Sequence, residues 1–136
     1  MRRRFVLATA LSVGLSTAVA YAASPHITKA LAFPPGHDVP PQTEFAPDIS
    51  QIIVEAQIRD IKPGDKVTAT WIAEKTKGAP PNYKIDSATM APVPGKLIAF
   101  TLSKPNAGFP VGDYRVDLSY NGHVELSQHF KVVAPG

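Results

Sequence analysis

The sequence predicts an all-β chain that folds as an antiparallel sandwich or barrel of about seven strands. Apolar and polar residues alternate with a period of two over several short runs, which is the pattern of half-buried strands. Turn-forming Pro, Gly, Asn and Asp residues separate these runs at short intervals. Beyond the N-terminal leader, no segment carries an apolar stripe of helical period.

The chain begins with a segment typical of a secretory signal peptide. Three arginines follow Met1, residues 5–20 are uncharged and rich in Leu, Val and Ala, and small residues precede a cleavage site after Ala22. An uncleaved membrane anchor is the alternative, but the apolar run is shorter than the ~20 residues that cross a bilayer. We therefore assign residues 1–22 to a signal peptide and expect a periplasmic or secreted protein without membrane insertion.

Export changes the charge of the chain. Removing the three leader arginines from the 14 basic residues leaves 11, which balance the 11 acidic residues. A balanced surface without a basic stripe argues against nucleic-acid binding. The absence of cysteine excludes disulfides, thiol nucleophiles and thiolate metal sites.

Residues 23–47 form a proline-rich arm that contains six of the 14 prolines. Proline fixes φ and removes a donor of the β-ladder, so we expect this arm to be extended and irregular. A possible edge strand covers residues 26–33, and a short one covers residues 43–46.

Residues 48–136 form the predicted sandwich domain. Each strand here is bounded by turn residues, such as Pro63 and Gly64 after the first one. The strands are expected over residues 51–60, 66–74, 83–90, 96–103, 113–120 and 123–133.

The inward rows of these strands predict a core around large aromatic residues. We expect Trp71, Phe100, Tyr114 and Phe130 to form it. For the last hairpin, a two-residue turn at Asn121-Gly122 would pair an apolar row with a polar row. We therefore favour a type I turn with a G1 bulge, which places Val124 inward.

Trp71 in mid-strand and the run 109–114, with Tyr114 opening a strand, carry a resemblance. The chain resembles the immunoglobulin and fibronectin type III class, and in particular exported bacterial immunoglobulin-like modules. The resemblance implies an immunoglobulin-like sandwich, with the Tyr114 hydroxyl bonded to backbone just upstream in a tyrosine corner. It names no function.

The stretch 112–132 also resembles the end of periplasmic copper-resistance β-sandwiches of the CopC type. Those proteins bind copper partly through an N-terminal histidine. Here no cleavage site leaves His26 first, and Pro25 lacks the amide that an amino-terminal copper clip needs. We keep copper binding as the alternative function, and we expect no metal site or cofactor.

The residues that could carry chemistry are scattered. His123 and His129 share one strand at roughly 20 Å, too far apart to share a metal. A carboxylate, a histidine and a serine from the outward face of the last hairpin could form a catalytic relay. This face carries Asp113, Arg115, Asp117 and Ser119 beside His123, Glu125, Ser127 and His129. Because such a face offers no oxyanion hole, we expect ion pairs there and no enzyme activity.

Ile53 and Ile72 fall on outward faces of the first two domain strands. If these strands are neighbours, the two residues form a small apolar patch, covered by the arm or open to a partner. We expect a small, monomeric, non-catalytic module that binds a protein or envelope polymer. A copper protein and an envelope hydrolase are the competing functions.

Overall fold

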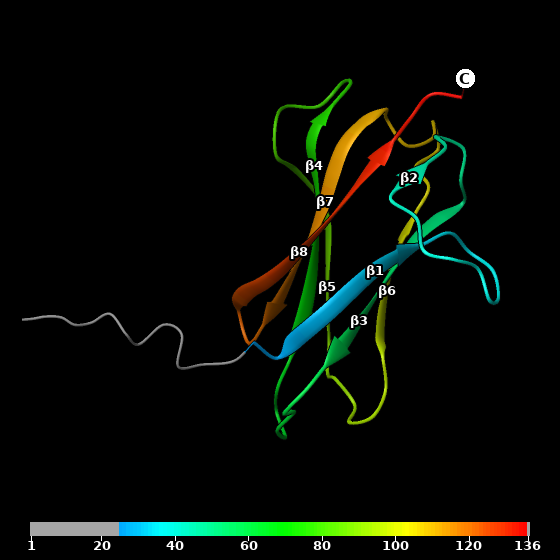
Figure 1. The fold of residues 1–136 in the computed structure, drawn as a ribbon. Coiled ribbons are helices and arrows are strands. Elements are labelled where there is room, and N and C mark those ends of the chain that lie inside the picture. The colour runs from blue at the N-terminus through cyan, green and yellow to red at the C-terminus, as the bar shows by residue number, and fades with distance from the viewer. Residues whose placement is uncertain (1–24, 136) are drawn as a thin grey trace, which may run out of the picture.

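The computed structural model describes residues 25–135, which form two β-sheets and no helix (Figure 1). The three-stranded sheet has the order β1-β3-β6, and the five-stranded sheet has the order β2-β8-β7-β4-β5. The predicted signal peptide lies outside the described residues. The strands are β1 (Ile27–Phe33), β2 (Glu44–Phe45), β3 (Gln51–Ile58), β4 (Val67–Thr76), β5 (Tyr83–Met90), β6 (Ile98–Ser103), β7 (Gly112–Tyr120) and β8 (His123–Val132).

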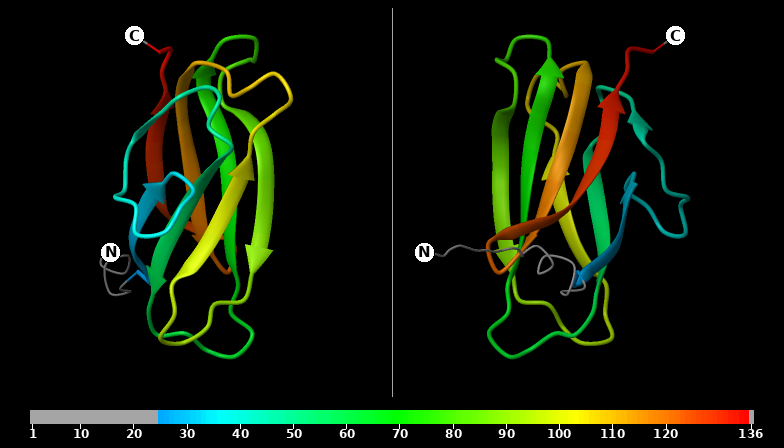
Figure 2. Two further views of the ribbon diagram at one scale, coloured as in Figure 1. Left: turned by 90° about the vertical axis from the view of Figure 1, so that its right-hand side faces the viewer. Right: turned by 60° about the vertical axis from the view of Figure 1, so that its left-hand side comes forward.

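The two sheets face each other in two layers (Figure 2). All neighbouring strands are antiparallel except β2 and β8, which are parallel. The all-β prediction is confirmed, and two facing sheets are consistent with a β-sandwich. There are eight strands, close to the predicted number of about seven.

The core lies between the sheets, where the apolar rows of both meet. In β6, Ile98, Phe100 and Leu102 are buried and alternate with exposed residues, as the period of two predicts. Trp71 from β4 and Tyr114 from β7 are each 1% exposed. Their rings pack around Phe130 with centroids 6.1 and 5.1 Å from its ring, and Phe45 joins from β2 at 5.8 Å.

Both strands expected in the proline-rich arm are present and belong to the sheets. β1 is an edge strand of the three-stranded sheet and pairs with β3, while β2 pairs with β8. Ile27, Ala32 and Phe45 from these strands are at most 2% exposed and are part of the core. The arm therefore contributes buried apolar surface to both layers.

The last hairpin differs from the expected bulged turn. Asn121 and Gly122 have φ values of 49° and 90°, and Tyr120 pairs directly with His123, which describes a two-residue type I′ turn. The bulge comes later, because Glu125 is an extra residue in β8. It restores the match of the two apolar rows, and it leaves Val124, expected inward, 61% exposed.

Candidate functional site

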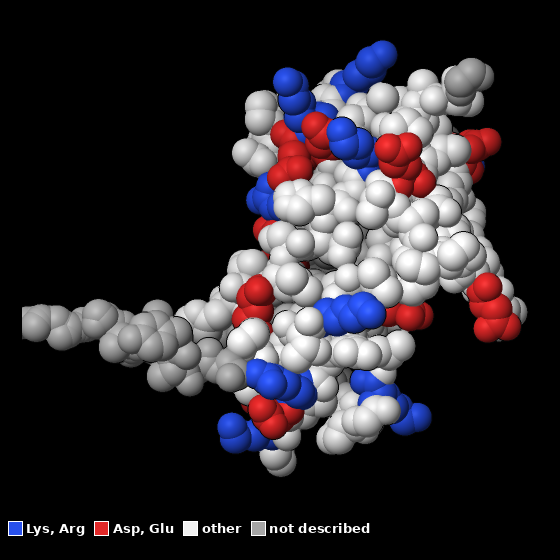
Figure 3. Space-filling view, viewed as in Figure 1, with Lys and Arg blue, Asp and Glu red and all other residues white. Residues whose placement is uncertain are grey.

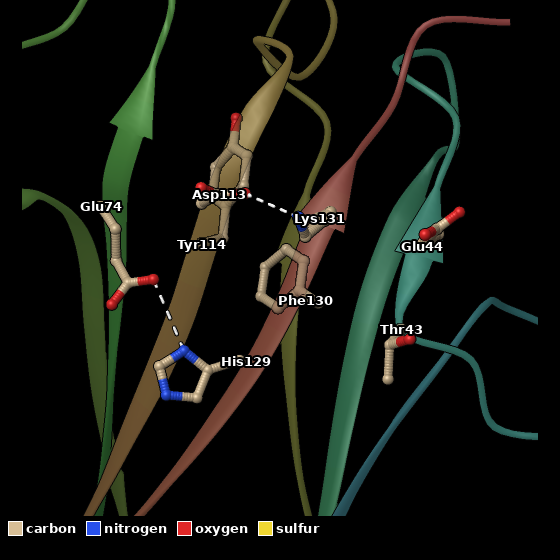
Figure 4. Close-up of a pocket in the computed structure, with 8 residues that line it drawn as sticks. All are labelled: Thr43, Glu44, Glu74, Asp113, Tyr114, His129, Phe130 and Lys131. Atoms are coloured by element: carbon tan, nitrogen blue, oxygen red, sulfur yellow. Dashed lines mark ion pairs between the residues drawn. The ribbon is translucent and has the colours of Figure 1, made fainter.

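The outward face of the five-stranded sheet carries a network of ion pairs. Arg115 on β7 donates to Glu74 at 3.0 Å and to Asp117 at 2.9 Å. These bonds, to Asp117 first and then to Glu74, raise the pKa of Arg115 above its ordinary value. His129 lies 3.5 Å from Glu74, and Lys131 lies 3.6 Å from Asp113 (Figure 4). Figure 3 shows mixed acidic and basic side chains over this end of the sheet.

The network does not assemble the relay that the sequence could form. Ser127 donates to Asp117 at 2.6 Å, whereas His129 contacts Glu74, so serine and histidine use different carboxylates. The shallow hollow of about 410 Å³ beside these residues is open to solvent, and the His129 side chain is 64% exposed. Such a face suits mutual ion pairing better than a reaction that must exclude water.

Sequence reasoning missed Glu74 because the polar face was expected on the last hairpin alone. Ala73 pairs with Tyr114 and Lys75 pairs with Asp113, which leaves Glu74 as an extra residue in β4. Alternation in β4 places Glu74 on the outward face with Thr68 and Thr70, but it does not reveal that β4 lies beside β7, which carries Arg115.

The four histidines of the chain lie apart. The ring of His26 stacks on Tyr120 with centroids 4.0 Å apart, and its Nδ1 donates to the carbonyl oxygen of Arg59. His37 follows β1, and His123 and His129 lie on β8. Within residues 25–135, no group of three or more His, Asp or Glu residues is placed to hold a metal ion.

Ile53 and Ile72 do not form the shared patch that adjacent strands would have allowed. Ile53 is on β3 and Ile72 is on β4, and these strands belong to different sheets. Ile53 pairs with Phe33 and lies beside the chain that follows β1, where it lines a cavity of about 230 Å³ with Val39. Ile72 is 8% exposed and lies outside the main core cluster.

The side of the molecule formed by residues 83–103, here called the open side, exposes apolar surface. It comprises β5, β6 and the loop between them, and the two strands are the edges of the two sheets on this side of the molecule (Figure 2, left). Every residue of β5 except Ile85 is exposed, because the three-stranded sheet is too narrow to cover all five strands opposite. The exposed apolar side chains here are Tyr83 at 51%, Met90 at 37% and Val93 at 51%. Leu97, also exposed, lies instead over the outer face of the three-stranded sheet, where it lines a hollow with Leu31 and Phe33.

A small apolar cavity of about 160 Å³ opens at one end of this side. Tyr83 and Ile85 of β5 and Leu102 of β6 line it, together with Phe109 and Tyr114. Thr76 also lines it, and its Oγ1 is the one buried side-chain polar atom in the described part of the chain that lacks a hydrogen-bond partner. An unsatisfied hydroxyl beside an apolar cavity is a group that an occupant could satisfy.

Comparison with protein-family models and with curated proteins found no match. No helix within the described residues is long and apolar enough to cross a membrane.

Proposed function

We propose that the chain is a small, exported, non-catalytic immunoglobulin-like module that binds a protein or an envelope polymer. The open side carries this proposal, because three of the six large apolar side chains that are exposed among residues 25–135 belong to it, namely Tyr83, Met90 and Val93. Exposed apolar side chains beside an apolar cavity, here the one that Tyr83 and Ile85 line, are typical of an interaction site.

The strand order supports an immunoglobulin-like topology. β1-β3-β6 corresponds to strands A-B-E of that class, and β4-β7-β8 corresponds to C-F-G. Trp71 lies on the strand equivalent to C, and the Tyr114 hydroxyl donates to the carbonyl oxygen of Pro110 in the manner of a tyrosine corner. β5 pairs with β4 instead of extending the first sheet, which differs from the constant-type arrangement.

Export of the protein is proposed because residues 1–22 have the features of a signal peptide. Protein recovered from the cell envelope or medium should begin at Ala23 and lack residues 1–22, as intact mass and N-terminal sequencing would report. Recovery of the full-length chain from the cytoplasm alone would contradict this part of the proposal.

Binding at the open side is tested by photocrosslinking in intact cells. A photoreactive phenylalanine analogue at Met90 should form an adduct with a partner. The matched control places it at Val124, which is also apolar and exposed, but on β8. Adducts at Val124 alone, or equally at both positions, would contradict binding through the open side.

A further inference from the structure

The edge of β6 offers unpaired main-chain groups in a regular row. Lys104 N donates to Ser50 O at 2.9 Å, which fixes the hydrogen-bonding phase between β6 and β3. In an antiparallel ladder alternate residues point at the partner, so Ile98, Phe100 and Leu102 bond to β3. The N–H and C=O groups of Ala99, Thr101 and Ser103 therefore point to the outer edge. Among residues 25–135 no second strand pairs with them.

The other sheet edges are protected and β6 is not. The β1 edge is tied by Gln42 N, which donates to Ala32 O, and β2 has only two residues. β5 carries a bulge at Ile85 and two charged residues. By contrast, β6 pairs with β3 through six consecutive residues without a register shift, and it contains neither charge nor proline. Bulges, charges and short length are the features that discourage strand addition.

The charges around β6 indicate the kind of strand it accepts. Lys96 and Lys104 lie just before and just after it, both exposed and without an ion pair among the described residues. Residues 77–111 carry four lysines and only one acidic residue, Asp86. Antiparallel pairing of β6 with a second copy, centred on Phe100, would set Lys96 opposite Lys104, and like charges directly opposite are destabilising.

We propose that an extended segment of an acidic partner protein pairs with β6 and adds a fourth strand to the three-stranded sheet, an inference that rests on the proposed binding function. Acidic residues at the two ends of this segment would meet Lys96 and Lys104, which are roughly 26 Å apart along an extended chain. Alternate apolar residues would face the uncovered side of β5, including Tyr83 and Met90. This is strand addition, in which main-chain bonds supply affinity and alternate side chains supply specificity.

The test uses labelled synthetic peptides and the exported protein. The peptide EEVTVTVEE should bind at least about tenfold more tightly than KKVTVTVKK in fluorescence anisotropy at low salt, and added salt should reduce the difference. Amide exchange should slow at Ala99, Thr101 and Ser103. Charge reversal by Lys96→Glu with Lys104→Glu should invert the peptide preference, while Lys29→Glu with Lys66→Glu, of equal net charge, should not.

Thr101→Pro removes one outer-edge donor of β6 without removing a bond to β3, and it should weaken peptide binding about tenfold. Ser87→Pro in β5 is the matched control and should leave binding unchanged. Circular dichroism and thermal melting verify that each variant is folded. No binding, equal binding of the two peptides, or protection in β5 instead of β6 would overturn the proposal.

The same variants separate this inference from the proposed function. If the yield of the Met90 adduct is the same in Thr101→Pro as in the unaltered protein, or if its partner is a polymer or a second copy of the chain, binding at the open side stands and strand addition to β6 is wrong. If no Met90 adduct forms in the protein whose β6 sequence is unaltered, the proposed binding function itself is wrong.

Discussion

Glu125 on β8 accepts the backbone N–H of Ile27 through Oε1 at 2.8 Å, and so a bulge near the end of the chain holds the first strand of the opposite sheet. The same oxygen accepts the N–H of His26 at 2.8 Å. One side of the two-sheet stack is therefore tied by β1 and β8, while the side formed by β5 and β6 is open.

Glu125→Ala should lower the free energy of unfolding by about 2 kcal/mol, because two backbone donors lose a charged acceptor. Glu125→Gln should cost less, since its amide oxygen can still accept. Urea unfolding measures both values. Glu44→Ala, an exposed carboxylate on β2, should stay within about 0.5 kcal/mol of the unaltered protein. Equal losses for Glu125→Ala and Glu44→Ala would show that the tie between the sheets contributes nothing.

Asp65 should make the protein sensitive to acid. Hydrogen bonds from Tyr120, Asn121 and the backbone of Lys62 lower the pKa of Asp65 from 3.8 to about 2. Because the folded-state pKa is depressed, its stabilising effect is present above pH 3.8 and is lost as the pH falls to about 2. The free energy of unfolding, measured as a function of pH, should fall less steeply at acidic pH in Asp65→Asn than in the unaltered protein. Asp48→Asn, an exposed control, should retain the original slope.

Tyrosines should limit stability at high pH. Burial raises the pKa of Tyr114 to about 12, and burial followed by the bond to Asp65 raises the pKa of Tyr120 to about 12. Raised folded-state values stabilise the protein below the ordinary pKa of 10.0, and this effect disappears as the pH rises toward 12. Tyr120→Phe should flatten the decline between these pH values. If the loss of stability at alkaline pH is unchanged in both Tyr114→Phe and Tyr120→Phe, ionisation of these tyrosines is not its cause.

The strands were predictable from sequence because alternation reports directly on burial. In β6 the large apolar residues are the buried ones, and the bounds of β5, Tyr83–Met90, match those expected from the turn residues around it. The type of the last turn was not correctly predicted, although Asn-Gly favours type I′. Register could be restored at any later residue of β8, and Glu125 is the one whose carboxylate finds two donors at the start of β1.

Sheet membership and the open side could not be derived from strand patterns. Ile53 and Ile72 lie on β3 and β4, which follow each other in the sequence with a short turn between them. Such strands can form a hairpin or belong to different sheets, and the sequence pattern does not reveal that the second arrangement holds here. The exposure of Tyr83 and Met90 depends on one sheet being narrower than the other, which is a property of the whole topology. Local periodicity contains neither piece of information.

Two glycines with positive φ should respond differently to alanine. Gly112 opens β7 with φ +149°, and a Cβ there would lie 2.2 Å from Lys75 O and 2.7 Å from Thr76 Cα. Because both are backbone atoms, β4 and β7 would have to separate, and Gly112→Ala should cost more than about 4 kcal/mol or prevent folding. Gly122, at φ +90° in the type I′ turn, has no atom within 4 Å of the position that a Cβ would take. Gly122→Ala should therefore cost only the backbone strain, about 1–2 kcal/mol. Thermal melting and urea unfolding of the two variants would rank them, and the reverse order would show that the close approach of β4 to Gly112 is not maintained in solution.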